Sequence, residues 1–253
     1  MRHIAFWFSQ LTRGSVRKKD RSAAPMEQET CNWTGEMPRG ATLKIMNVAG
    51  NIEVAGTSVR EFRVTALKRG EAGDLPGISF DVSEQPGETI IRTIYSDRLP
   101  PSSDAHVHFM IEIPREGSFV GRTSNGQIKI TEITDVEAVS SNGSIHIVDA
   151  RSANAETRNG QIDVSIQAAQ WDGSMQFRTQ NGGIRVQLPP DASTEFRAET
   201  SNGWVSTEFP LKSVKRNSRQ LVHGMIGGDA AGRQIICKTS NGSVHLARSQ
   251  FVA

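Results

Sequence analysis

The segment Thr123-Ser-Asn-Gly-Gln-Ile128 decides the fold, because the chain repeats its pattern five more times. Each copy reads Ser or Thr, a variable residue, Asn, Gly, a second variable residue, and Ile or Val. The other copies begin at Ser140, Thr157, Thr179, Thr200 and Thr239. Their asparagines follow one another at spacings of 17, 17, 22, 21 and 39 residues. A recurring period of this length is typical of repeat architectures, in which each unit buries its apolar face against its neighbours.

Apolar and polar residues alternate on both sides of each Asn-Gly pair, which is the period of a strand with one buried face. The positions six and four residues before each Asn are apolar or small, and the position three before is mostly charged. Beyond the glycine, the apolar face continues in Ile128, Ile145, Ile162, Ile184, Val205 and Val244. Each copy is therefore predicted to form two short strands joined by a corner.

The Asn-Gly pair is the predicted structural turn of each copy, because these residues tolerate the left-handed backbone that most others avoid. If the copies stack, their asparagine side chains can form a hydrogen-bonded ladder. The predicted turn residues are Asn125, Gly126, Asn142, Gly143, Asn159, Gly160, Asn181, Gly182, Asn202, Gly203, Asn241 and Gly242.

The chain is predicted to be all-β, and two architectures fit the repeat. One is a right-handed β-helix or β-solenoid of Asn-Gly-cornered coils, with a less regular N-terminal β region. The alternative is a β-hairpin meander or sandwich, in which each Asn-Gly pair closes a hairpin. Similar columns at a nearly constant period favour the solenoid. We also expect divergent copies at Asn47–Val54, where Ala49 replaces Asn, and at His223–Ile226, inside the 39-residue gap.

The sequence divides into three predicted parts. Residues 1–30 are expected to be a disordered or misassigned leader, residues 31–118 an N-terminal β-strand region, and residues 119–253 the solenoid, continuous with the preceding region. The leader begins with a short apolar stretch that ends at Phe8, and the basic run Arg17–Arg21 stands where a signal peptide has its apolar core. We therefore expect it to contribute nothing to the fold.

Charge and cysteine content exclude several classes of protein. Residues 1–30 hold six basic and three acidic residues, so the rest of the chain is close to neutral, and a nucleic-acid partner is not expected. No apolar run approaches the ~18 residues that span a bilayer, so no transmembrane segment is predicted. Cys31 and Cys237 are far apart and belong to no metal-binding spacing. Whether they form a disulfide is left open.

Three groups of residues resemble chemical sites. Lys129, His146 and Asp163 share an outward column on consecutive coils. His106 and His108 alternate on one strand, and Gly227-Gly-Asp-Ala-Ala-Gly232 has the composition of a phosphate loop. A solvated face, exposed strand histidines and an ordinary turn explain them better, because no third metal ligand and no Lys-Ser/Thr accompany them. Cys237 falls in an inward column and is expected to be inert. We predict no catalytic, cofactor-binding or metal-binding residue, and no cofactor.

The repeat copies, together with Gly50-Asn-Ile-Glu-Val54 and Lys238-Thr-Ser-Asn-Gly-Ser-Val-His-Leu246, resemble the bacterial "putative adhesin" family of β-strand-repeat proteins. This is a domain family of unknown function, and the resemblance covers about residues 35–248. It implies an extracytoplasmic or cell-envelope protein without established catalytic residues. Because residues 1–30 contain no clear signal peptide, a cytoplasmic location stays open.

These observations lead to one principal hypothesis and two alternatives. The principal hypothesis is a non-catalytic cell-envelope or surface scaffold that binds a glycan or a protein partner of the envelope. A solenoid ends in unpaired strands, so the terminal coil is expected either to be blunted by polar groups such as His245, Arg248 and Gln250 or to self-associate with another protomer. The alternatives are a carbohydrate-active β-helix enzyme, such as a lyase or hydrolase, and an envelope-stress accessory protein.

Overall fold

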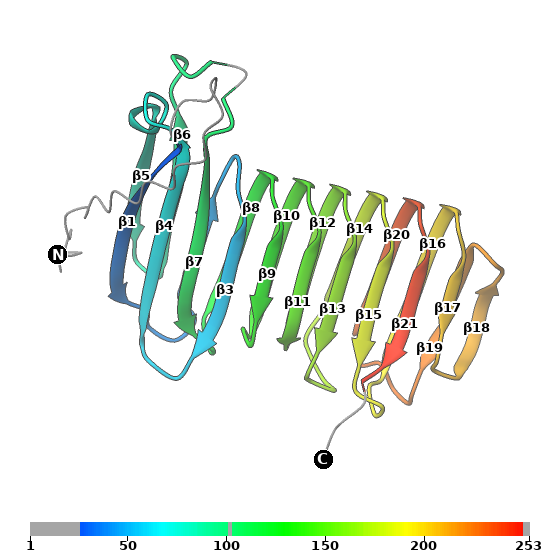
Figure 1. Cartoon of the computed structure of the whole chain (residues 1–253). Helices are drawn as coiled ribbons and strands as arrows, with labels where there is room; N and C mark the ends of the chain where they lie inside the picture. Colours follow the sequence, from blue (N-terminus) through cyan, green and yellow to red (C-terminus); the bar gives the residue numbers. More distant parts are fainter. Residues whose placement is uncertain (1–25, 101–102, 250–253) are drawn as a thin grey trace.

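The structure is a computed structural model that describes residues 26–100 and 103–249. Two large mixed sheets face each other and enclose the apolar core between them (Figure 1). Within the described residues, the only helix is the single 3-10 turn η1 (Leu75–Gly77). The strands form an elongated row of coils rather than a closed barrel, as Figure 1 shows. The all-β prediction is confirmed.

Each repeat copy contributes one strand to each sheet. The ten-stranded sheet contains, in spatial order, β1 (Met26–Glu36), β4 (Glu61–Glu71), β7 (His106–Pro114), β3 (Ile52–Thr57), β9 (Ile128–Thr131), β11 (Ile145–Ala150), β13 (Ile162–Ile166), β15 (Ile184–Leu188), β21 (Val244–Arg248) and β17 (Val205–Thr207). The eleven-stranded sheet contains β18 (Leu211–Asn217), β19 (Leu221–Ile226), β16 (Thr194–Asn202), β20 (Gln234–Asn241), β14 (Ser174–Asn181), β12 (Ser152–Asn159), β10 (Asp135–Asn142), β8 (Ser118–Asn125), β2 (Thr42–Met46), β6 (Glu88–Tyr95) and β5 (Ile78–Gln85).

Neighbouring repeat copies pair in parallel and in register. Asn142 lies opposite Asn125 on one side and Asn159 on the other. On the second sheet, Ile145 lies between Ile128 and Ile162 in the same manner. A hairpin meander would pair these strands antiparallel, so the repeat region has the solenoid-like arrangement in which equivalent residues stack.

The core is narrow and consists of stacked columns. Ile128, Ile145, Ile162 and Ile184 form one column, and none is more than 1% exposed. Burial of each such side chain contributes about 2–3 kcal/mol relative to leaving it exposed. In the facing sheet, the large side chain of Phe177 lies between the small residues Ala155 and Cys237 of the neighbouring coils.

The spatial order of the coils departs from the chain order at both ends. The coil β20/β21 lies between β14/β15 and β16/β17, although it follows both along the chain. At the other end, β2/β3 lies between β6/β7 and β8/β9. The expected terminal position of the C-terminal coil is therefore wrong, and the unpaired strand edge on which self-association was expected does not lie at this coil. The coil β16/β17 and the β18/β19 hairpin occupy that end (Figure 1).

The 39-residue gap between the last two asparagines contains a hairpin instead of a degenerate coil. His223 lies in β19, which pairs antiparallel with β16 and with β18. An antiparallel strand runs against the direction of the coils and cannot form their corner, so the prediction of a copy at His223–Ile226 is wrong. By contrast, Ala49 forms a parallel bridge with Asn125, and the Asn47–Val54 segment turns beside the regular corners.

The boundary expected at residue 30 also differs from the structure. Residues 26–30 belong to β1, which pairs antiparallel with β4 along its whole length. Trp33 in β1 and Phe62 in β4 are buried in the shared core, which explains why the strand is held. The rest of the predicted leader, residues 1–25, lies outside the described residues. In the described part of the chain, no helix is long and apolar enough to cross a membrane.

Candidate functional site: the corner ridge

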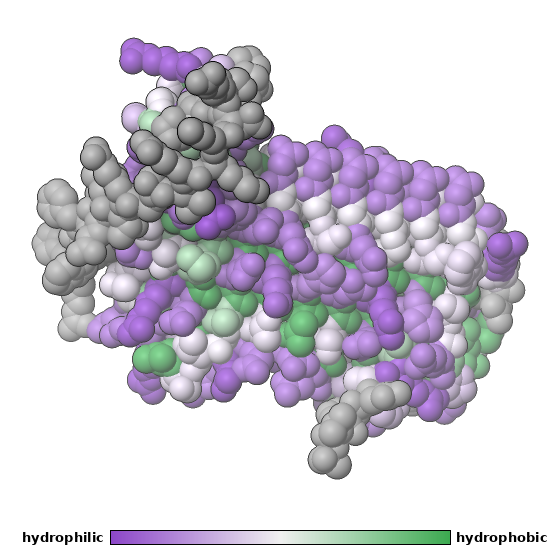
Figure 2. Space-filling model, in the orientation of Figure 1, coloured by the Kyte–Doolittle hydropathy of each residue, from purple (hydrophilic) through white to green (hydrophobic). Residues whose placement is uncertain are grey.

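The six Asn-Gly corners lie side by side along one long edge of the molecule, at the top of the coils in Figure 1. We define the corner ridge as the asparagine of each copy, the residue before it, and the residue after the glycine. Figure 2 shows regular rows of hydrophilic residues along this edge. The residues beside the asparagines are Ser124, Gln127, Ser141, Ser144, Arg158, Gln161, Gln180, Gly183, Ser201, Trp204, Ser240 and Ser243.

The asparagine side chains of the ridge form a continuous hydrogen-bonded ladder. Each Nδ2 atom donates to the Oδ1 atom of the neighbouring asparagine over 2.7 to 2.9 Å. The rungs follow the spatial order Asn125, Asn142, Asn159, Asn181, Asn241 and Asn202. The ladder fixes the rotamer of every amide in the row.

The ladder uses only part of the hydrogen-bonding capacity of each amide. An asparagine amide has two N–H donors and an oxygen with two lone pairs, and an interior rung spends one donor and one lone pair on its neighbours. The asparagines are exposed, so the remaining donor and lone pair are accessible to a ligand. Coils repeat at about 4.8 Å, and the ridge therefore presents oriented donors and acceptors at that spacing.

A buried row of hydroxyl groups supports the ridge from below. The residue two before each asparagine is Thr or Ser, is at most 7% exposed, and donates to the glycine carbonyl oxygen of an adjacent coil. These bonds are 2.7 to 3.3 Å long and join Thr123 to Gly50, Ser140 to Gly126, Thr157 to Gly143, Thr179 to Gly160, Thr239 to Gly182 and Thr200 to Gly242. Sequence reasoning assigned this row no role. The presence of Ser or Thr at this position in all six copies was the sequence feature that could have indicated this role.

The glycines of the corners are required by the close approach of neighbouring coils. A Cβ atom on Gly143 would lie 2.0 Å from the carbonyl oxygen of Gly126, and the same clash recurs from coil to coil. The expected positive φ occurs at the glycines and not at the asparagines. It is 153° to 159° at Gly126, Gly143, Gly182 and Gly242, a conformation that L side chains rarely adopt, and none of the six asparagines has a positive φ. Gly160 and Gly203 lie outside this region, yet an added Cβ atom would clash there too. Backbone conformation and stacking distance therefore both select glycine in this row.

The structure brings together the outward residues Lys129, His146 and Asp163. They occupy consecutive rungs on the outer face of the ten-stranded sheet, opposite one another in register. The Nδ1 atom of His146 lies 3.3 Å from Oδ2 of Asp163, and both side chains remain about a third exposed. The pair forms an exposed ion pair when His146 is protonated, and such pairs contribute little to stability.

The two histidines of β7 lie against each other without forming a metal site. The rings of His106 and His108 are 4.6 Å apart between centroids. The Nδ1 atom of His106 lies 2.7 Å from the carbonyl oxygen of Asp104, and Nδ1 of His108 accepts from the backbone N–H of Asn51. Burial, together with the nearby His106 and Arg69, lowers the pKa of His108. Among the described residues, no group of three His, Cys, Asp or Glu is arranged to hold a metal.

The glycine-rich segment and the second cysteine have structural positions. Residues 227–233 connect β19 to β20, a strand rather than a helix, and the N–H of Gly228 donates to Oγ of Ser193. The segment is thus a turn with internal contacts. Cys237 is buried in β20, and burial raises the pKa of its thiol, so the reactive thiolate is disfavoured.

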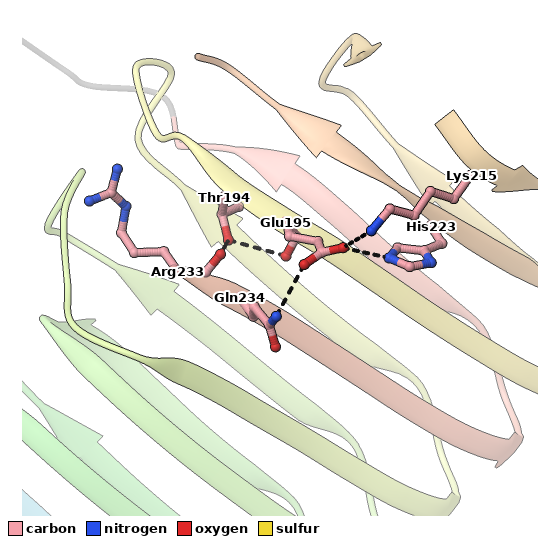
Figure 3. Close-up of polar contacts among 6 residues, drawn as sticks. All are labelled: Thr194, Glu195, Lys215, His223, Arg233 and Gln234. Atoms are coloured by element: carbon pink, nitrogen blue, oxygen red, sulfur yellow. Dashed lines mark hydrogen bonds and ion pairs between the residues drawn. The ribbon is translucent and has the colours of Figure 1, made fainter. Parts of the chain in front are cut away.

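Sequence reasoning did not identify a polar cluster around Glu195 on β16 (Figure 3). One carboxylate oxygen accepts from Nζ of Lys215 at 2.6 Å and lies 2.7 Å from Nε2 of His223. The other accepts from Nε2 of Gln234 at 3.1 Å. Hydrogen bonds from Lys215 and His223 lower the pKa of Glu195 to about 2. Its partners lie on β18, β19 and β20, which no sequence spacing brings together.

Comparisons with known proteins agree with this architecture. The family model described as Toastrack DUF4097 matches residues 102–247. The crystal structure of a "putative cell adhesion protein" from Clostridium sporogenes is 9% identical, covers 87% of this chain and 100% of its own, and has a TM-score of 0.51, which shows a shared fold. A "putative adhesin" from Bacteroides fragilis is 9% identical and covers 86% of this chain and 96% of its own, with a TM-score of 0.29. No curated protein matches the chain.

Proposed function

The chain belongs to the Toastrack DUF4097 family, and from this premise we propose that it is a non-catalytic surface or cell-envelope scaffold whose corner ridge binds a glycan. The similar structure from Clostridium sporogenes is named a "putative cell adhesion protein", which supports a surface role. The same comparison supports a location outside the cytoplasm.

The observation that carries the glycan proposal is the asparagine ladder. It holds a straight row of amide donors and acceptors on a rigid double sheet, so a ligand need not order them. A polymer of hydroxyl-rich units can bond to several rungs at once, and repeated weak contacts add up along the row. At one end of the ridge, Trp204 is 54% exposed and offers an aromatic surface against which a sugar ring can stack.

The geometry supports a scaffold over the carbohydrate-active enzyme. An acid–base site gains strength when closure excludes water from its charged groups. His146 and Asp163 instead pair with each other on an outer sheet face and stay in contact with solvent. The ridge, similarly, contains amides and hydroxyls rather than carboxylates.

Two finer features belong to the same proposal. The coils are right-handed, because a crossover between neighbouring parallel strands of one sheet nearly always has that hand. Two continuous regions meet near Ser118: the N-terminal strands, which begin with β1 at Met26, and the repeat coils, which begin with β8.

Binding to defined glycans tests the proposal. Calorimetry with chitohexaose, dextran and solubilised peptidoglycan fragments should reveal at least one ligand. Replacement of Trp204 and Gln161 by Ala should weaken its binding by about tenfold, as lost stacking and hydrogen bonds are worth about 1.4 kcal/mol together. The matched control, Lys129→Ala on the outer sheet face, should leave binding unchanged. The proposal fails if none of these glycans binds, if only Lys129→Ala matters, or if a glycan is cleaved.

A further inference from the structure

We call β20/β21 the inserted coil, and we call the space that it fills between β14/β15 and β16/β17 the slot. The two walls of the slot offer the inserted coil equivalent pairing partners. Thr239 pairs with Thr179 of β14 on one side and with Thr200 of β16 on the other, both in parallel. On the facing sheet, Val244 pairs with Ile184 and Val205 in the same way. The slot therefore fits a coil of this repeat in one register. A coil from a second copy of the chain would fit in the same register as the chain's own coil.

The hydrogen bonds of the slot select the repeat motif itself. Thr239 donates to the carbonyl oxygen of Gly182, and the carbonyl oxygen of Gly242 accepts from Thr200. Asn241 joins the ladder on both sides, to Asn181 and to Asn202. Only a segment with Thr, Asn and Gly at these spacings satisfies every one of these groups. The C-terminal coil of this chain has that sequence.

The inserted coil is connected to the rest of the fold through one turn. Residues 227–233 join it to β19, and three of them, Gly227, Ala231 and Gly232, have φ of 70°, 47° and 82°. A glycine-rich turn can change its backbone direction at low cost, because glycine populates both signs of φ. The coil can thus separate from its own slot as a unit while the connection adjusts.

Glu195 lies on β16, one wall of the slot, and contacts both the end hairpin and the inserted strand (Figure 3). It binds Lys215 and His223 of the end hairpin and Gln234 at the start of the inserted strand. The backbone N–H of Glu195 also donates to the carbonyl oxygen of Arg233, and so does the hydroxyl of Thr194. This cluster lies where the inserted coil begins, and the charge-assisted bond from Gln234 to Glu195 opposes release of the coil.

We propose that the C-terminal coil, residues 234–248, is exchangeable, and that the partner it binds is a second copy of this chain. Each copy has one slot and one coil, so reciprocal exchange closes a two-fold dimer and leaves no slot open. The contacts inside each slot are the same before and after exchange. The balance between monomer and dimer then depends on the turn 227–233, on protein concentration and on the Glu195 cluster.

Crosslinking of full-length chains tests the exchange. Arg178 and Lys238 face each other across β14 and β20. Two chains, one carrying Arg178→Cys and the other Lys238→Cys, both with Cys31→Ser, are mixed and treated with a short thiol crosslinker. The expected product is a covalent dimer joined between positions 178 and 238, identified by mass spectrometry. Glu195→Gln in both chains should accelerate its formation about tenfold, because the charge-assisted bond to Gln234 is lost.

Three controls make the result decisive. The double variant Arg178→Cys/Lys238→Cys must crosslink within one chain, which shows that the pair reacts. Glu156→Cys mixed with Arg178→Cys probes β12 and β14, which do not exchange, and should give no dimer joined at these positions. Glu156→Gln, an exposed change of the same kind, should not alter the rate. Absence of the 178–238 dimer, or an equal yield of the 156–178 dimer, would overturn the proposal.

Discussion

Asn202 and Asn241 are adjacent rungs of the ladder, although 39 residues separate them: Nδ2 of Asn202 donates to Oδ1 of Asn241 over 2.8 Å. Asn241 in turn donates to Asn181, so the later residue lies between the two earlier ones. The ladder therefore follows the spatial order of the coils and not their order along the chain. Repeat register is maintained across the inserted coil because every copy presents the same hydrogen-bonding groups.

Interruption of the ladder should lower stability. Asn159 takes part in two of its bonds, one to Asn142 and one to Asn181. We expect Asn159→Ala to reduce the free energy of unfolding by about 1–2 kcal/mol, since each net hydrogen bond contributes about 0.5–1.5 kcal/mol. Arg158→Ala, at the adjacent exposed position, should change it by less than about 0.5 kcal/mol. Urea unfolding of both variants measures the difference; equal losses would mean that the ladder contributes no stability.

A methyl group on a corner glycine should disrupt stacking. Gly160→Ala places a Cβ atom 2.1 Å from the backbone oxygen of Gly143, which cannot move without separating the coils, and Gly160 lies outside the positive-φ region that would add strain of its own. The expected loss is about 3 kcal/mol or more, at the upper end of overpacking effects. Gly73→Ala is the matched control, because nothing lies within 4 Å of its added Cβ. Thermal unfolding that ranks the two variants equally would contradict the steric explanation.

Adjacent residues of one strand should respond in opposite ways to substitution. Ile145 is completely buried and His146 points outward, so Ile145→Asp buries a carboxylate among apolar side chains. This should cost about 4 kcal/mol or more, while His146→Ala should cost less than about 0.5 kcal/mol. The same contrast is expected for Val244 and His245, the equivalent pair in the inserted coil. Chemical denaturation checks both pairs, and a reversed ranking at either would refute the register.

The Glu195 cluster should make stability depend on pH in the acid range. The pKa of Glu195 is lowered to about 2, below the ordinary value of about 4.3 in an unfolded chain. Its stabilising contribution is therefore complete above about pH 5 and is lost as the pH falls towards 2. Unfolding free energies of the wild type and Glu195→Gln should differ most at neutral pH and converge near pH 2. A constant difference across this range would exclude the charged cluster as the cause.

The repeating part of the fold follows from local patterns in the sequence. The alternation around Ile128 and its equivalents predicted which face is buried, and the constant asparagine predicted residues that do stack in the structure. These features depend on contacts between equivalent positions of neighbouring copies. Such positions can be recognised in the sequence because the same residue type recurs there. The role of the Thr157 column was missed because a hydroxyl two residues before Asn suits a turn as well as a buried bond to the next coil.

The ends of the molecule could not be predicted in the same way. Whether β20 pairs with β14 or lies outside β16 depends on a choice between identical edges, and the motif is the same in both cases. Glu195 meets Lys215 and His223 only after the end hairpin has formed. Long-range strand pairings of this kind depend on which arrangement buries the most apolar side chains and leaves the fewest polar groups without a hydrogen bond. The local pattern of His223–Ile226 predicted a degenerate coil for that reason.

The insertion of β20/β21 also has a consequence for biosynthesis. A ribosome completes β14–β19 before it makes residues 234–248, so a nascent chain has both walls of the slot but not the segment that separates them. Unpaired strand edges of this kind promote aggregation. Translation must therefore reach residues 234–248 before the two sheets can be continuous in the strand order of the complete chain.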